Sequence, residues 1–178
     1  MPDYRRNRVP GGTYFFTVNL LERRRELLTS HVEELRNAVR GVRRRRPFHI
    51  DAWVVLPDHL HCIWTLPPQD ADFSTRWKEI KVTFARSLPA GERLSPVRRV
   101  KGERGIWQRR FWEHTIRDDR DYARHMDYVH FNPVKHGHVA CAADWPYSSF
   151  RRCVVAGIYP EDWGGGQTVE GGFGERSH

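Results

Sequence analysis

Residues 53–64 read WVVLPDHLHCIW, two runs of β-forming residues on either side of Pro57-Asp58. Pro and Asp favour a turn, so this segment predicts two adjacent strands joined by a tight connection. The second strand begins with His59 and His61, whose side chains project to the same face because strand side chains alternate. We call this pair the histidine clamp, and we expect both rings to be buried.

Apolar patterning around this hairpin predicts one strand before it, two helices and a fourth strand. The expected strands are 13–20, 49–56, 60–66 and 111–117, and the expected helices are 30–45 and 73–88. Residues 89–105 are polar and rich in Arg, Pro and Gly, which indicates a loop. The order βαββαβ predicts an α+β, ferredoxin-like antiparallel sheet with its helices on one face.

A further helix is expected after Asp118, which can cap its N-terminus. Its apolar stripe consists of Tyr122, Met126 and Val129. Tyr128 lies about 120° from the middle of that stripe, on the side of Asn132. Because Pro133 disfavours helical geometry at the residue before it, we expect the helix to end at about Asn132, whose amide can then point into a site.

These residues suit phosphodiester chemistry. Two neutral imidazoles with an amide or carboxylate oxygen can hold a divalent ion and leave positions for a phosphate oxygen and water. Such an ion polarises a phosphodiester and orients it for in-line attack. Tyrosine can act as a covalent nucleophile when the electrophile is activated and held in place, which would give a phosphotyrosine link.

Ordinary structural roles remain open for all of these residues. His59 and His61 can be core histidines, and Tyr128 can be a packing residue. Surface, capping or structural roles are expected for the neighbouring Glu113, His114, His125, His130, His136 and His138.

The clamp segment and YVHFNPVKHG at 128–137 together resemble the REP-associated tyrosine transposases. These are bacterial relatives of the single-tyrosine, HUH-class insertion-sequence transposases. The resemblance runs from about Tyr4 to Trp163 and includes GGTYFFTVN at 11–19 and WQRRFWEH at 107–114. It implies the ferredoxin-like sheet with an added C-terminal helix that carries the tyrosine over the working face.

The resemblance also implies an activity, namely cleavage and rejoining of single-stranded DNA. Tyr128 would form a 5′-phosphotyrosine intermediate and leave a free 3′-hydroxyl. Mg²⁺ or Mn²⁺ would be bound by His59 and His61, with Asn132 where insertion-sequence relatives have glutamine. The substrates would be repetitive extragenic palindromes, recognised as single-stranded DNA hairpins.

Composition favours a polyanionic partner, since the formal charge is +8 and the pI is near 9.9. The candidate DNA contacts are Arg5, Arg6, Arg8, Arg109, Arg110 and Lys135. Tryptophans beside the arginine clusters suit base stacking.

Two alternative functions remain open. One is a non-catalytic single-stranded nucleic-acid-binding protein, and the other is a phosphodiesterase that uses activated water. A binding module, however, needs neither the clamp nor an off-stripe tyrosine.

The length of 178 residues suits one catalytic domain, expected at 1–163, followed by a flexible Gly-rich tail at 164–178. Three scattered cysteines predict no disulfide framework, and no apolar run is long enough to cross a membrane. We therefore expect a cytoplasmic, nucleoid-associated bacterial protein. A monomer is favoured over a homodimer, because one chain can hold both the clamp and Tyr128.

Overall fold

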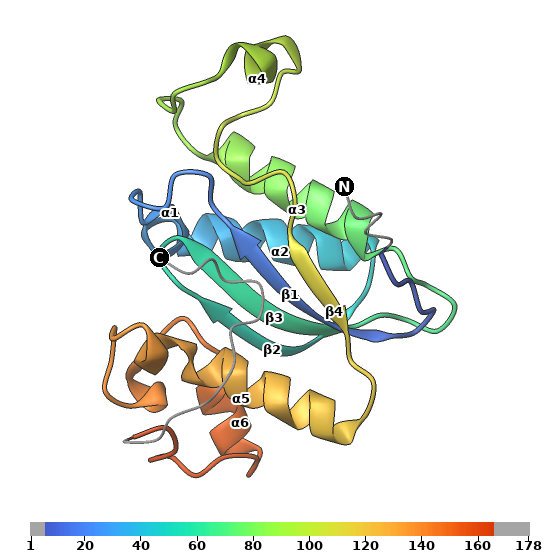
Figure 1. Ribbon diagram of the computed structural model, residues 1–178, viewed down its shortest axis with the longest axis vertical. Coiled ribbons are helices and arrows are strands. Elements are labelled where there is room, and N and C mark those ends of the chain that lie inside the picture. Colours follow the sequence, from blue (N-terminus) through green and yellow to red (C-terminus); the bar gives the residue numbers. More distant parts are fainter. Residues whose placement is uncertain (1–5, 166–178) are drawn as a thin grey trace.

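The computed structural model describes residues 6–165 and has a four-stranded antiparallel sheet at its centre (Figure 1). The strands are β1 (Thr13–Asn19), β2 (His49–Val55), β3 (His59–Thr65) and β4 (Trp112–Thr115). Their order in the sheet is β2-β3-β1-β4. A tight turn joins β2 to β3, and in it the Leu56 amide donates to the His59 carbonyl at 2.9 Å.

Helices cover both faces of the sheet. They are α1 (Leu27–Ser30), α2 (Val32–Arg45), α3 (Phe73–Ser87), α4 (Pro96–Val100), α5 (Asp119–Lys135) and α6 (Phe150–Val155), with a 3-10 turn η1 (Ala142–Asp144). Helices α2 and α3 lie on one face, and α5 crosses the other (Figure 1). This arrangement confirms the predicted ferredoxin-like α+β fold with an added tyrosine-bearing helix.

Alternation along the strands builds two hydrophobic cores. Phe16 and Trp64 point to the α2 and α3 side, where Trp64 stacks on Trp77 of α3 with ring centroids 4.3 Å apart. Phe15 and Ile63 point to the α5 side. Burying a large apolar side chain contributes about 2 kcal/mol, so both faces of the sheet are held by the same effect.

Strand register decides which residues reach the α5 face. Thr17 of β1 is the Cα partner of His61 on β3 and of Trp112 on β4. Directly opposite residues in antiparallel strands share a face, so these three side chains form one row across the sheet. Cys62 lies on the opposite face in the α2 and α3 core, as alternation predicts.

Several local predictions were wrong. The predicted loop 89–105 contains α4, which Ser95 caps and Pro96 begins. The helix expected at 30–45 is present as α2 from Val32, but the short helix α1 that precedes it was not predicted. Helix α6, which packs under α5, was not predicted, because its six residues are too few to show a helical repeat of apolar residues.

Helix α5 also runs through Pro133 to Lys135, although it was expected to end at Asn132. Proline inside a helix costs about 3 kcal/mol, because its ring displaces a hydrogen bond. Here Phe131 and Pro133 are buried, and the Phe131 ring packs against Trp163 at 6.2 Å. Packing of this last turn offsets the cost and carries Lys135 onto the helix.

Arg76 on α3 is almost fully buried and ties the helix to two loops. Its guanidinium pairs with both carboxylate oxygens of Asp70 at 2.7 and 3.1 Å, and donates to the carbonyls of Arg46, Pro47 and Asp72. Replacing it (Arg76→Met) should lower the free energy of unfolding by about 3 kcal/mol, because buried acceptors lose their donor. Urea unfolding measures this loss. Arg86→Met, at an exposed position on the same helix, is the control, and an equal loss there would contradict the assignment.

None of the helices within residues 6–165 is both long and apolar enough to cross a membrane. All three cysteines are free thiols. Except for Gly164 and Gly165, the predicted flexible tail lies outside the described residues.

Candidate active site

The two rings of the histidine clamp lie together on the α5 face of β3. Their centroids are 5.0 Å apart, and His59 and His61 are 2% and 0% exposed. They sit where β3 begins, directly after the turn that contains Asp58. The strand therefore positions both rings, as the spacing predicts.

Each ring is oriented through its Nδ1 atom. His59 Nδ1 lies 2.7 Å from Asp58 Oδ1, and His61 Nδ1 lies 2.8 Å from Thr17 Oγ1. Metal-binding histidines commonly donate their second N–H to a carboxylate or another acceptor, which fixes the tautomer. A metal ion would therefore be bound through Nε2 of both rings.

The Asp58 carboxylate is itself held from the other side by Arg23, whose Nε lies 2.5 Å from Oδ2. Burial raises the pKa of Asp58, but hydrogen bonds from His59 and Arg23 outweigh it and lower the pKa to about 2. Asp58 is thus an anion at neutral pH and accepts a hydrogen bond from the His59 ring. Sequence reasoning treated Pro57-Asp58 only as a turn and missed this role, as it missed that of Thr17.

Helix α5 places Tyr128 beside the clamp of the same chain. The Tyr128 and His61 ring centroids are 5.2 Å apart at 74°, and Phe15 of β1 packs edge-on against Tyr128 at 5.9 Å. Tyr128 is 1% exposed. The tyrosine that lies off the apolar stripe in the sequence therefore faces the sheet at the clamp.

Lys135 reaches back along α5 to the tyrosine. Its Nζ donates a hydrogen bond to Tyr128 Oη at 3.2 Å and lies 4.8 Å from the ring centroid. Seven residues separate the two positions, which places them on one face of a helix. The sequence assigned Lys135 to phosphate contact and predicted a helix that ended before it, so this contact was missed.

Asn132 is fully buried one turn after Tyr128. Its Nδ2 points toward the Tyr128 carbonyl at 3.5 Å, a long contact. The amide oxygen of Asn132 and the imidazole nitrogens of the clamp are donor types that suit a divalent ion. The assignment of His59, His61 and Asn132 as the ligands of such an ion stays a prediction.

His136 adds a further imidazole that sequence reasoning treated as a surface or capping residue. It does form the C-cap of α5, and its amide donates to the Asn132 carbonyl at 3.0 Å. Its ring also approaches His59, with centroids 5.2 Å apart. The end of α5 thus brings the clamp another nitrogen base.

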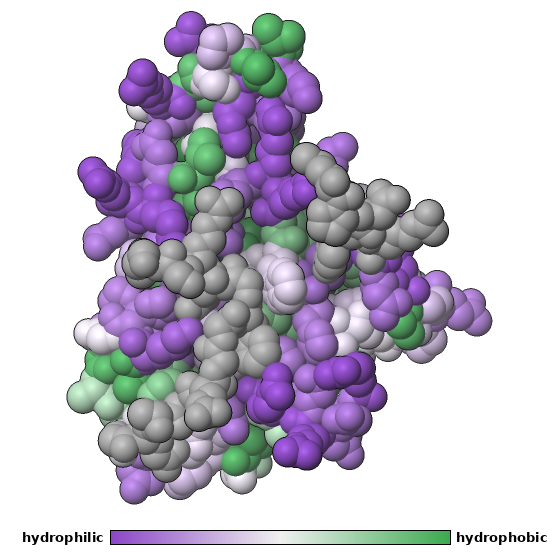
Figure 2. Space-filling model, in the orientation of Figure 1, coloured by the Kyte–Doolittle hydropathy of each residue, from purple (hydrophilic) through white to green (hydrophobic). Residues whose placement is uncertain are grey.

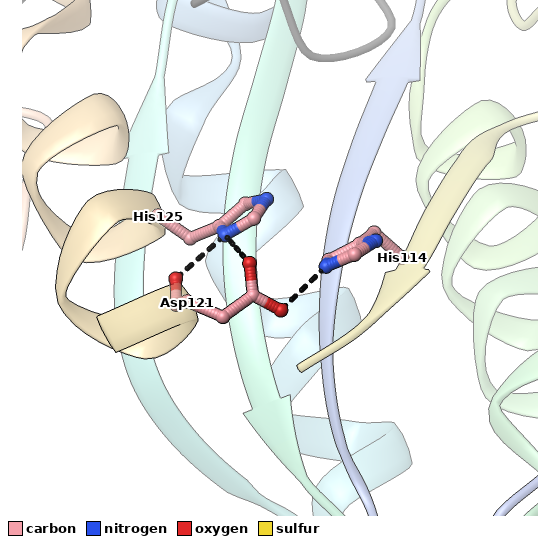
Figure 3. A group of neighbouring side chains, drawn as sticks. All are labelled: His114, Asp121 and His125. Atoms are coloured by element: carbon pink, nitrogen blue, oxygen red, sulfur yellow. Dashed lines mark hydrogen bonds and ion pairs between the residues drawn. The ribbon is translucent and has the colours of Figure 1, made fainter. Parts of the chain in front are cut away.

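A second histidine cluster lies beside the clamp, where β4 meets the first turns of α5 (Figure 3). Asp121 Oδ2 lies 2.7 Å from His114 Nε2, and Asp121 Oδ1 lies 3.2 Å from His125 Nδ1. The two rings stack at 4.7 Å. We call His114, Asp121 and His125 the brace, because the carboxylate joins the two rings directly and so holds β4 to α5.

The brace is separated from the clamp by Phe15, whose ring lies 4.9 Å from His125 and 5.7 Å from His61. Burial lowers the pKa of His125. Burial raises the pKa of Asp121, but hydrogen bonds from His114 and from the Arg117 amide outweigh it and lower the pKa. The brace offers three ligand atoms that lie within 4.8 Å of one another and could also hold a metal ion. An experiment must therefore distinguish metal binding at the brace from metal binding at the clamp.

His130 and Glu113 have structural surroundings, as the sequence analysis expects. His130 Nε2 lies 2.8 Å from Ser149 Oγ, and burial lowers the pKa of this ring to about 4. Glu113 is buried on the α3 side of β4 and pairs with Arg6 at 3.7 Å.

Unlike Lys135, the arginines predicted to contact DNA do not gather at the clamp. Arg6 and Arg8 bond Ser74 Oγ at 2.8 and 3.4 Å, and Arg109 pairs with Glu103 at 2.9 Å. Arg110 is exposed just before β4, and Arg5 lies outside the described residues. Two of these arginines line a groove of about 540 Å³. Its eight basic lining residues are Arg6, Lys78, Lys81, Arg86, Arg98, Lys101, Arg104 and Arg109. We call it the basic groove.

Comparison with known proteins identifies the family. Residues 12–132 match the family described as Transposase IS200 like. The chain is 52% identical over 168 residues to the REP-associated tyrosine transposase of Escherichia coli (strain K12), covering 94% of each chain. It is also similar to a solved structure described as "Structure of the REP associates tyrosine transposase bound to a REP hairpin", with a TM-score of 0.85, 50% identity, and coverage of 100% of this chain and 99% of that one. The chain therefore belongs to the IS200-like transposases and, within them, to the REP-associated tyrosine transposases, which are DNA transposase enzymes.

Proposed function

We propose that this transposase cleaves and rejoins single-stranded DNA at palindromic repeat hairpins, with Tyr128 as the nucleophile and a divalent ion at the clamp. The observation that carries the proposal is the packing of Tyr128 against His61 at 5.2 Å within one chain. A similar protein was solved with a REP hairpin bound, which supports the choice of substrate.

In this proposal Tyr128 Oη attacks the phosphorus in line with the departing 3′-oxygen. A P–O bond to tyrosine forms, the bond to the 3′-oxygen breaks, and the 5′ end remains on the protein. The proton lost by tyrosine balances the proton gained by the 3′-hydroxyl. Attack by a 3′-hydroxyl on the phosphotyrosine reverses the step, so strands are rejoined without ATP.

His59, His61 and Asn132 would hold Mg²⁺ or Mn²⁺, which supplies Lewis-acid polarisation of the phosphate when bound. Asp58 and Thr17 hold the two rings in place through Nδ1 for this task. Because one chain provides the clamp and the nucleophile, we propose that the monomer is the catalytic unit. We also propose that residues 1–163 form the catalytic domain and that the protein works on chromosomal repeats in the cytoplasm.

A covalent-trapping assay tests the proposal. The protein is incubated with labelled single-stranded repeat hairpins and Mn²⁺ or Mg²⁺, denatured, and examined for labelled protein. We expect an adduct that requires the ion and accompanies cleavage. Cleavage without any adduct would favour activated water, and tight, salt-sensitive binding without cleavage would contradict the proposed chemistry.

Lys135 should accelerate the covalent step rather than strengthen DNA binding. Its ammonium stabilises negative charge on Tyr128 Oη, and removal of such a group costs about 100-fold in rate. We expect Lys135→Ala to slow adduct formation by about that factor at saturating hairpin, and Lys135→Arg to retain most of the rate. Single-turnover kinetics separate the two roles. If Lys135→Ala instead weakens hairpin affinity and leaves the rate at saturating hairpin unchanged, Lys135 is a phosphate contact, as the sequence predicts.

A further inference from the structure

Trp112 is the exposed aromatic residue next to the candidate active site. It opens β4 at the edge of the sheet and is 44% exposed. Within residues 6–165 every other aromatic side chain is buried or half-buried. An exposed indole at this place offers a flat π-face on which a nucleobase can stack.

Strand register places Trp112 on the clamp side of the sheet. Its Cα partner is Thr17, which is also the partner of His61 and bonds the His61 ring. Neighbouring strands are about 4.8 Å apart, so the backbones of Trp112 and His61 are separated by roughly 10 Å. His114, two residues further along β4, reaches α5 through the brace, which confirms that this side of β4 faces α5.

Helix α5 packs over β2 and β3. In the ribbon, β4 lies at the edge of the sheet away from β2 (Figure 1). A DNA strand that approaches the clamp from the β4 edge therefore passes Trp112 within a nucleotide or two of the reacting phosphate.

The charge on the other side of β4 favours the same path. Phe111, the residue before Trp112, lines the basic groove, in which eight side chains are Lys or Arg and one, Glu103, is acidic. Hydrophilic side chains surround smaller apolar groups on the surface over α3 and α4 (Figure 2). A phosphate backbone bound along the groove reaches the sheet at the edge where Trp112 stands.

We propose that Trp112 is a stacking platform for one nucleobase of the DNA strand that flanks the cleaved phosphodiester. The indole presents its face to the base, a contact that tolerates any base because every base has a π-face. This subsite rests on the proposed function for its substrate. It would hold the strand in place while the neighbouring phosphate lies at the clamp.

The test asks whether removing the Trp112 indole and removing one nucleobase of the hairpin weaken binding through the same contact. Repeat hairpins carry an abasic residue at one flanking position at a time, and their equilibrium affinity is measured without added metal for the wild type, Trp112→Ala and Trp112→Phe. Stacking on an aromatic side chain corresponds to a roughly 5- to 100-fold change in affinity per base. We expect a loss of this size for Trp112→Ala on the intact hairpin and recovery in Trp112→Phe. At one position the abasic change should weaken the wild type but not Trp112→Ala.

Ile158→Ala, at an exposed apolar position beyond α6, serves as the control and should bind like the wild type. An intact-hairpin affinity unchanged in Trp112→Ala, or an equal loss on every abasic hairpin, would overturn the stacking assignment. Because this readout needs no chemistry, it is independent of the trapping assay. If Trp112→Ala and one abasic position show this dependence while the trapping assay gives no covalent adduct, the stacking site stands and the phosphotyrosine step is rejected.

Discussion

Tyr128→Phe should abolish the covalent adduct and lower hairpin cleavage by at least roughly a thousandfold, which is the scale for removing a catalytic nucleophile. The substitution removes only the hydroxyl that would attack phosphorus and that accepts the hydrogen bond from Lys135. The ring keeps its packing against His61 and Phe15. Hairpin affinity should therefore stay close to that of the wild type, which gel-shift titration beside the trapping assay can measure.

Tyr122→Phe is the matched control, since Tyr122 lies on the same helix and its hydroxyl bonds Asp51 at 3.1 Å, away from the clamp. That variant should form the adduct normally. Retained cleavage in Tyr128→Phe without an adduct would assign the attack to water. A persistent adduct would place the nucleophile on another residue.

His61→Ala should remove both metal binding and metal-dependent cleavage. Loss of the residues that merely orient a ligand costs about 10- to 100-fold in metal affinity or activity, so loss of the ligand itself should exceed 100-fold. The cavity left beside Thr17 and Tyr128 also loosens the tyrosine. Electron paramagnetic resonance of added Mn²⁺ measures binding separately from cleavage.

Two controls make this result specific to the clamp. His49→Ala changes an exposed histidine at the start of the neighbouring strand and should bind Mn²⁺ normally. His114→Ala breaks the brace and should also retain Mn²⁺ binding. If Mn²⁺ binding instead survives in His61→Ala and disappears in His114→Ala, the metal belongs to the brace and the proposed ligand set is wrong.

The strands, the two long helices of the sheet and the position of the clamp were predictable because each depends on local pattern. Alternation of apolar residues fixes which face a strand side chain takes, so His59 and His61 had to lie opposite Cys62. Errors arose where packing outweighs local preference. Pro133 is weakly compatible with a helix, yet burial of Phe131 and Pro133 carries α5 on to Lys135.

The sequence by itself determined the sheet and the place of the histidine pair on it, and it predicted the chemistry of the site, since two histidines at strand spacing and an off-stripe tyrosine with a nearby asparagine point to a metal clamp and a nucleophile. Only the tertiary structure decided which residues support them. Thr17 meets His61 through strand register, the docking of α5 brings Tyr128 and His136 to the clamp, and the last turn of α5 brings Lys135 to Tyr128. Those contacts join residues far apart along the chain, or depend on where a helix ends, and neither spacing nor composition encodes them.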